Sequence, residues 1–174
     1  MGLPASGKTT LSKALAEALN LPLINRDDIK VRILDAVGWG DREWSKKAGK
    51  ASFNILDDII NQMILSKSSF IIESDFNPEF ANEKFNTISK SGYKFIQIIC
   101  TADPDIIISR WKHRAAHDKT HPSSTEGKQG LNELLEAISK GPRKPLDIPG
   151  EVMTIDTGSE LHTLDFIHRV KDLI

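Results

Sequence analysis

The sequence predicts an α/β fold, in which helices pack on both faces of a parallel sheet. Short apolar runs alternate with longer amphipathic segments along all 174 residues, which is typical of repeated strand–helix units. The chain opens on a glycine-bounded loop that leads into a helix, as in many α/β proteins. The composition, 39% hydrophobic and 27% charged, is ordinary for a soluble protein. We therefore expect one domain over residues 1–174.

The opening loop matches the pattern G-x-x-x-x-G-K-[ST] of a phosphate-binding loop. Its small residues let successive backbone N–H groups point at phosphate oxygens, and the following helix, expected over residues 9–19, adds its positive dipole end. Lys8 places a cation on the β- and γ-phosphates, and the Thr9 hydroxyl can ligate Mg²⁺. We expect ATP and Mg²⁺ as cofactors, bound by Gly2, Pro4, Ala5, Ser6, Gly7, Lys8, Thr9 and Thr10.

Only Met1 precedes this loop, although a phosphate loop normally follows a buried parallel strand. The side chains of such a strand would contribute on the order of 10 kcal/mol by burial, which is comparable to the stability of a whole domain. We expect either that the natural protein begins earlier, or that another segment fills the slot and the loop is poorly formed.

A first strand is predicted over residues 21–25, and two aspartates follow it closely. The carboxyl ends of strands in an open parallel sheet face the ligand crevice, so Asp27 is the candidate general base for an attacking hydroxyl. The alternative is that Asp27 or Asp28 caps the next helix, expected over residues 29–37, while the other carboxylate points into the cleft. Lys30 is either an acceptor-phosphate ligand or part of a solvated face.

A long helix is predicted over residues 41–67, with an apolar stripe at Ile55, Ile59 and Met63. The next strand begins at Phe70 and ends beside Glu73, the expected acid on the Mg²⁺ side of the site.

Beyond that strand, Asp75 and Asn77 are expected over the acceptor, although Asn77 followed by proline also starts a helix. The remaining expected elements are a helix at 78–91, a strand at 93–100, a helix from 104, a helix at 130–140, a strand at 152–156 and a helix at 159–174 capped by Ser159.

A polar segment at about residues 111–130 loses the apolar period and is predicted to be a lid over the nucleotide. Just before and within it, Arg110 and Arg114 are four residues apart and could clamp the transferring phosphate bidentately. The alternative is a solvated helix end, and the sequence does not distinguish the two arginines.

The bulk composition limits the partners. A net charge of −1 argues against a nucleic-acid coat protein but leaves room for a local basic groove. The single Cys100 suits a reducing cytoplasm, since it has no partner for an internal disulfide. No apolar run is long enough to predict a membrane span.

Three segments, 2–9 (GLPASGKT), 25–28 (NRDD) and 73–78 (ESDFNP), resemble the kinase domain of the polynucleotide 5′-hydroxyl kinase and zeta-toxin-like group of P-loop kinases. The resemblance covers nearly the whole chain. It implies a three-layer P-loop NTPase sandwich with a parallel sheet of order 2-3-1-4-5, whose central first strand is missing from this chain.

The same resemblance implies roles for individual residues. Asp27 falls on the catalytic base, and Lys30 falls where the family has an arginine that holds an acceptor phosphate. The lid arginine falls on Arg110 or Arg114.

The resulting hypothesis is an ATP-dependent kinase acting on a hydroxyl of a nucleic-acid 5′ end or of a small molecule. The alternatives are a nucleotide-binding ATPase or an inactive, truncated P-loop protein. A GTPase is disfavoured because no Asn-Lys-x-Asp guanine motif occurs.

Overall fold

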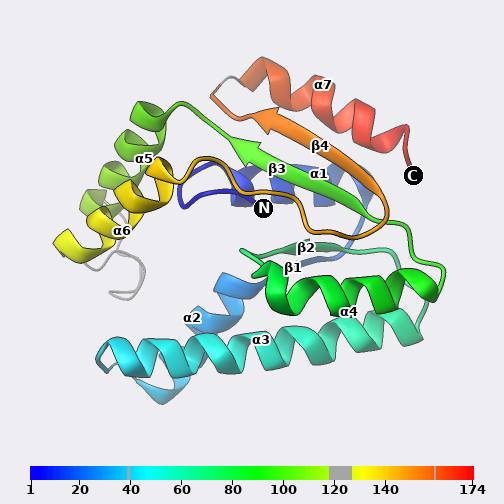
Figure 1. Cartoon of the computed structure of the whole chain (residues 1–174), viewed down its shortest axis with the longest axis horizontal. Helices are drawn as coiled ribbons and strands as arrows, with labels where there is room; N and C mark the ends of the chain where they lie inside the picture. Colours follow the sequence, from blue (N-terminus) through cyan, green and yellow to red (C-terminus); the bar gives the residue numbers. More distant parts are fainter. Residues whose placement is uncertain (39, 118–126, 159) are drawn as a thin grey trace. The chain divides into compact units, whose positions relative to one another are not determined.

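The computed structural model describes residues 1–38, 40–117, 127–158 and 160–174 (Figure 1). These residues form two compact units, which we describe separately. The first unit comprises Met1–Leu11 and Asp75–Ile174, and the second comprises Ser12–Ser74. Helix α1 (Lys8–Leu19) begins in the first unit and ends in the second. Each unit contains a pair of parallel strands and several helices, which confirms the predicted α/β class.

The first unit is built on strands β3 (Ile96–Thr101) and β4 (Glu151–Asp156), paired in parallel from Ile96 opposite Glu151 to Thr101 opposite Asp156. Figure 1 shows α7 running alongside β4. The helices of this unit are α4 (Pro78–Lys90), α5 (Pro104–His117), α6 (Gly127–Ser139) and α7 (Glu160–Lys171).

The first two residues of the chain lie against β3. The amino terminus donates to the Ile98 carbonyl at 2.6 Å, the Cys100 N–H donates to the Met1 carbonyl at 2.8 Å, and Gly2 forms a parallel bridge with Cys100. Strand β3 thus has a partner on each edge, because β4 occupies the other one. Among the described residues, a single parallel bridge therefore precedes the loop, where a phosphate loop normally follows a buried strand.

The second unit contains β1 (Leu23–Asn25) and β2 (Ile71–Glu73), which are parallel, with α2 (Arg26–Val37) and α3 (Arg42–Leu65). Helices α2 and α3 pack against each other, and Leu34 and Leu56 are fully buried. In the predicted order 2-3-1-4-5, strands 2, 3, 4 and 5 correspond to β1, β2, β3 and β4, and Gly2 lies at the position of strand 1. The pairs β1–β2, Gly2–β3 and β3–β4 each agree with this order, and the complete order remains a prediction.

The predicted apolar stripe of α3 was wrong by one position. The buried residues are Ser45, Ala48, Ser52, Leu56 and Ile60, whereas Ile55 is 41% exposed. Three of the five buried side chains are serine or alanine, so the buried face is lined by small residues that a count of large apolar side chains does not register. The predicted N-terminus was right, since the Asp41 side chain accepts from the Trp44 N–H at 2.9 Å.

Other predicted elements agree with the structure to within a few residues. Helix α2 begins earlier than expected, at Arg26, and Gly38 with φ 84° ends it. Residues 118–126 of the predicted lid and the predicted cap Ser159 lie outside the described residues, and the described ends of the lid segment are helical, in α5 and α6.

Candidate functional site: a braced phosphate loop and a buried acidic network

The loop before α1 is a tight turn with three residues at positive φ. Gly2, Ala5 and Gly7 have φ angles of 156°, 62° and 82°, the Ser6 N–H donates to the Leu3 carbonyl at 3.1 Å, and the Leu11 N–H bonds the Gly7 carbonyl at 3.0 Å. Pro4 is exposed, and Thr9 and Thr10 lie in the first turn of α1. The alternative of a poorly formed loop is wrong, because hydrogen bonds within the loop close the turn.

The ammonium group of Lys8 folds back over this loop. Its Nζ donates to the Gly2 carbonyl at 3.0 Å and to the Leu3 carbonyl at 2.8 Å. Ser6 is 1% exposed, and its hydroxyl is buried without a hydrogen-bond partner among the described residues. The Lys8 ammonium group is a cation held at the loop, and it suits an incoming phosphate group because its N–H groups can donate to phosphate oxygens.

A hydrophobic anchor fixes the other side of the loop. The Leu3 side chain is buried in a cluster with Ile107 and Trp111 of α5 and Leu134 of α6. Burial of a leucine contributes roughly 1.5–3 kcal/mol, so this contact holds the loop to α5 and α6, which overlap the two ends of the predicted lid.

A residue that sequence reasoning missed, Thr157, lies directly behind the loop. Its hydroxyl is 2.9 Å from the Ser6 carbonyl and 3.2 Å from the Thr101 carbonyl, and its N–H donates to the same Thr101 carbonyl at 2.8 Å. A Cβ on Gly7 would lie 2.8 Å from the Thr157 hydroxyl oxygen. No sequence motif marks Thr157, because its contact with Ser6 joins two residues that are 151 positions apart in the sequence.

The two candidate arginines of α5 have different surroundings. Arg110 is half-buried, and its two terminal nitrogens donate to the Thr157 hydroxyl at 3.0 Å and to the Thr157 carbonyl at 2.7 Å. Arg114 lies one turn later and is exposed. The structure thus separates two residues that the sequence left equivalent.

In the second unit, a buried carboxylate joins three elements. Glu73, at the end of β2, is 7% exposed, and its Oε2 accepts from the Ser12 hydroxyl of α1 at 2.8 Å and from the Asn25 amide at 2.9 Å. The buried Ser74 hydroxyl that follows has no hydrogen-bond partner among the described residues. Glu73 is therefore held by neutral donors at the carboxyl end of its strand.

The N-cap of α2 is Asn25, so the alternative in which Asp27 or Asp28 caps this helix is wrong. The Asn25 side-chain oxygen accepts from the Asp27 N–H at 2.8 Å and from the Asp28 N–H at 3.3 Å. Because Glu73 takes the amide NH₂ group, the amide oxygen must face the helix. Both aspartate side chains are thus left for other partners.

Asp27 is 69% exposed and forms an ion pair with Arg26. The Arg26 guanidinium lies 4.8 Å from the centre of the Phe53 ring, which fixes the cation against α3. Asp28 is exposed in the same first turn. The candidate base therefore stands at a helix start with one oxygen engaged by its neighbour.

The remaining predicted acceptor ligands have partners within the chain. Lys30 donates to the Ser45 hydroxyl at 2.9 Å. Asp75 pairs with Arg143 at 2.6 Å, and Arg143 is a second residue that the sequence did not single out. Asn77 is the N-cap of α4 through a 3.1 Å bond from the Glu79 N–H, which confirms its predicted helix-start role.

The residues predicted to hold Mg²⁺ are Thr9 of the first unit and Glu73 of the second, and each side chain carries an oxygen donor. The described residues contain no cluster of three or more histidine, cysteine or acidic side chains that could hold a metal ion. A hydroxyl such as Thr9 and a carboxylate such as Glu73 are hard oxygen donors, and Mg²⁺ is usually held by one or two protein oxygens together with nucleotide phosphates and water.

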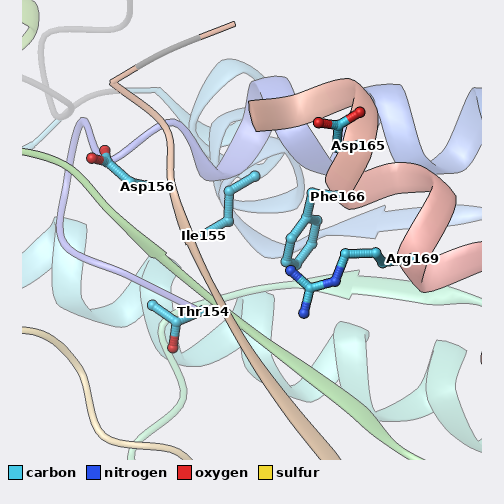
Figure 2. Close-up of a pocket in the computed structure, with 6 residues that line it drawn as sticks. All are labelled: Thr154, Ile155, Asp156, Asp165, Phe166 and Arg169. Atoms are coloured by element: carbon cyan, nitrogen blue, oxygen red, sulfur yellow. The ribbon is translucent and has the colours of Figure 1, made fainter. Parts of the chain in front are cut away.

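A separate hollow of about 280 Å³ lies between β4 and α7 (Figure 2). Figure 2 shows its lining residues, which are Thr154, Ile155, Asp156, Asp165, Phe166 and Arg169. Asp156 already accepts from the Gly158 N–H at 2.8 Å, and none of the six is a predicted site residue. This hollow is therefore not the predicted site.

Comparisons with known proteins bear on this arrangement. The sequence profile of AAA_33, described as an AAA domain, matches residues 1–134. The chain is 32% identical to a candidate kinase from Chloroflexus aurantiacus J-10-fl, with a TM-score of 0.90 over 100% of this chain and 95% of that one. A comparison with curated proteins finds no match.

More distant solved structures share the fold. Shikimate kinase from Bacteroides thetaiotaomicron is 20% identical with a TM-score of 0.60, covering 98% of this chain and 93% of that one. A gluconokinase from Sinorhizobium meliloti 1021 is 18% identical with a TM-score of 0.53, covering 98% and 91%. Among the described helices, each is too short or too polar to cross a bilayer.

Proposed function

We propose that this chain, which belongs to the AAA_33 family of P-loop kinases, transfers the γ-phosphoryl group of ATP to a hydroxyl group of an acceptor. The observation that carries this proposal is the closed, glycine-bounded turn over which the Lys8 ammonium group is folded. Membership of the AAA_33 family supports the same proposed activity.

In the proposal, the loop residues Gly2 to Thr10 hold the nucleotide phosphates by backbone N–H groups and by Lys8. Lys8 exchanges its two carbonyl contacts for phosphate oxygens when ATP binds. Thr9 and Glu73 would hold Mg²⁺, Glu73 through water. The metal supplies charge neutralisation at the phosphates.

Asp27 is the proposed general base. A positioned carboxylate takes the proton of the acceptor hydroxyl as that oxygen attacks the γ-phosphorus and ADP leaves. Asp28, Lys30, Asp75 and Asn77 are the proposed acceptor contacts. One of the α5 arginines neutralises charge on the transferring group.

We favour a small hydroxyl compound as the acceptor over a nucleic-acid end. The net charge of −1 gives no general attraction to a polyanion, and the shikimate kinase and gluconokinase structures share the fold. A nucleic-acid 5′ end remains the alternative acceptor.

The test is ADP formation from ATP with a panel of small polyols, hydroxy acids and 5′-hydroxyl oligonucleotides, repeated at several salt concentrations. A small acceptor predicts turnover that changes little with salt, whereas an oligonucleotide acceptor predicts a steep fall. ADP release that no acceptor increases would instead support the ATPase alternative.

The control for the site is a matched pair of lysine variants. Lys8→Ala should abolish turnover because the phosphates lose their cation. Lys13→Ala, at an exposed position on the same helix, should leave turnover unchanged. An active Lys8→Ala variant would mean that the loop is not the phosphate site.

A further inference from the structure

We infer that Arg110 and Thr157 form a brace that sets the phosphate loop in its nucleotide-binding shape, so that Arg110 is a positioning residue rather than a phosphate clamp. This inference rests on the proposed role of the loop as the nucleotide site. It concerns how that site is kept in shape, and it leaves Arg114 as the proposed clamp.

The direction of the hydrogen bonds around Thr157 follows from the chemistry of the guanidinium group. Arg110 can only donate, so the Thr157 hydroxyl oxygen must accept at 3.0 Å. The single hydroxyl hydrogen is then available to a carbonyl, and the nearer one is Ser6 at 2.9 Å. The second arm of Arg110, 2.7 Å from the Thr157 carbonyl, fixes the backbone of the same residue.

The bond to the Ser6 carbonyl determines where the next N–H points. In a trans peptide the carbonyl and the N–H lie on opposite sides of the chain. With the Ser6 carbonyl turned towards Thr157, the Gly7 N–H is turned away from Thr157. In a phosphate loop the backbone N–H groups must face the bound anion, and the brace holds this one in that orientation.

Steric contact supports the same conclusion. Thr157 lies so close to Gly7 that an added Cβ would be 2.8 Å from its hydroxyl oxygen and 2.9 Å from its Cβ. Thr157 itself is tied to β3 by its N–H bond to the Thr101 carbonyl. The brace therefore ties the loop to β3 and fixes the position of the loop relative to that strand.

Two of the five N–H groups of the Arg110 guanidinium are bonded to Thr157. A phosphate clamp that used the same two N–H groups would require both of them to leave Thr157. That exchange would release the Thr157 hydroxyl and the orientation of the Ser6 carbonyl at the moment when the loop must hold the phosphates. Arg114 is exposed and makes no hydrogen bond to Thr157 among the described residues, so it is the better candidate for contact with the transferring group.

The experiment measures the Kd of ATP at equilibrium, without acceptor, together with the thermal midpoint of each variant. Thr157→Val keeps the shape and removes the hydroxyl, and we expect it to raise the Kd about fivefold to tenfold. Thr157→Ser keeps the hydroxyl and should bind nearly as the wild type does. Thr154→Val on β4 and Lys90→Met on α4 are exposed controls that should leave the Kd unchanged.

A double-mutant cycle distinguishes the brace from a clamp. Because Arg110 acts through Thr157, Arg110→Met in the Thr157→Val background should weaken ATP binding little further. Effects that multiply would show that Arg110 contacts the nucleotide independently and would overturn the inference, as would a Thr157→Val variant with wild-type Kd. A wild-type protein without ATP affinity would overturn the proposed function as well.

Discussion

The phosphate loop and the turn that carries Asp27 are stabilised in different ways. The loop is proposed to offer backbone N–H groups to a ligand, and its contacts come from distant segments: Thr157 bonds the Ser6 carbonyl, and Arg110 bonds Thr157. The Asp27 turn is proposed to offer side chains. It is held by the buried Asn25, whose amide donates to Glu73 and whose oxygen accepts from the Asp27 N–H, while the Asp27 carboxylate itself is exposed. The phosphate loop is therefore held by side chains from other segments, whereas the Asp27 side chain is placed by the capped start of α2.

The largest expected effect separates chemistry from nucleotide binding. Asp27→Asn should lower turnover by ~10²–10⁴ because the amide cannot take the hydroxyl proton. The Kd of ATP should stay close to that of the wild type, since the backbone of the loop is untouched. Steady-state kinetics and ATP titration measure the two quantities.

The matched control is Asp35→Asn, which removes an exposed carboxylate paired with Arg32 on the same helix. It should leave turnover unchanged. Equal losses in the two variants, or none in Asp27→Asn, would remove Asp27 as the base.

The next effect tests the loop side of the comparison. Gly7→Ala places a Cβ against Thr157 at a φ of 82°, and we expect the affinity for ATP to fall at least about tenfold. Gly92→Ala is the control, because Gly92 also has a positive φ, of 90°, but has nothing within 4 Å of an added Cβ. If both variants bound ATP like the wild type, close contact with Thr157 would not shape the loop.

A smaller effect tests the support of the acidic turn. Asn25→Ala removes the α2 cap and one of the donors to Glu73, and should lower the free energy of unfolding by about 2–3 kcal/mol in urea titrations. Asn77→Ala removes an exposed cap of α4 and should cost only ~1 kcal/mol. Similar losses would mean that the buried bond to Glu73 adds nothing to a simple cap.

The smallest effect concerns a surface pair. Lys140 donates a hydrogen bond to Glu136 and attracts its charge, which lowers the pKa of that carboxyl below its ordinary value. The pair therefore stabilises the fold above that ordinary pKa, and this contribution disappears as the pH falls through the lowered one. Lys140→Met should reduce stability barely at pH 7 and not at all in acid, because both groups are exposed. A large loss at pH 7 in thermal melts would contradict this.

The sequence was informative where local chemistry decides the structure. The loop pattern, the helix start at Asp41 and the helix start at Asn77 all depend on residues within a few positions of one another, and each was found where expected. The alternation of strands and helices predicted the α/β class for the same reason.

The sequence was uninformative where distant segments meet. Asn25 caps α2 in place of the aspartates because Glu73 orients its amide, and that contact spans 48 residues. Thr157 and Arg143 reach their partners only through the fold. Three-dimensional proximity, rather than residue type, assigns these side chains to the candidate site.

The most direct test of the central claim is to follow the fate of the γ-phosphoryl group by ³¹P NMR, with ATP, Mg²⁺ and the best acceptor from the panel. The account predicts a new phosphomonoester that appears in equal amount to ADP and does not form with the Lys8→Ala variant. Inorganic phosphate as the product with every acceptor would contradict the assignment as a kinase.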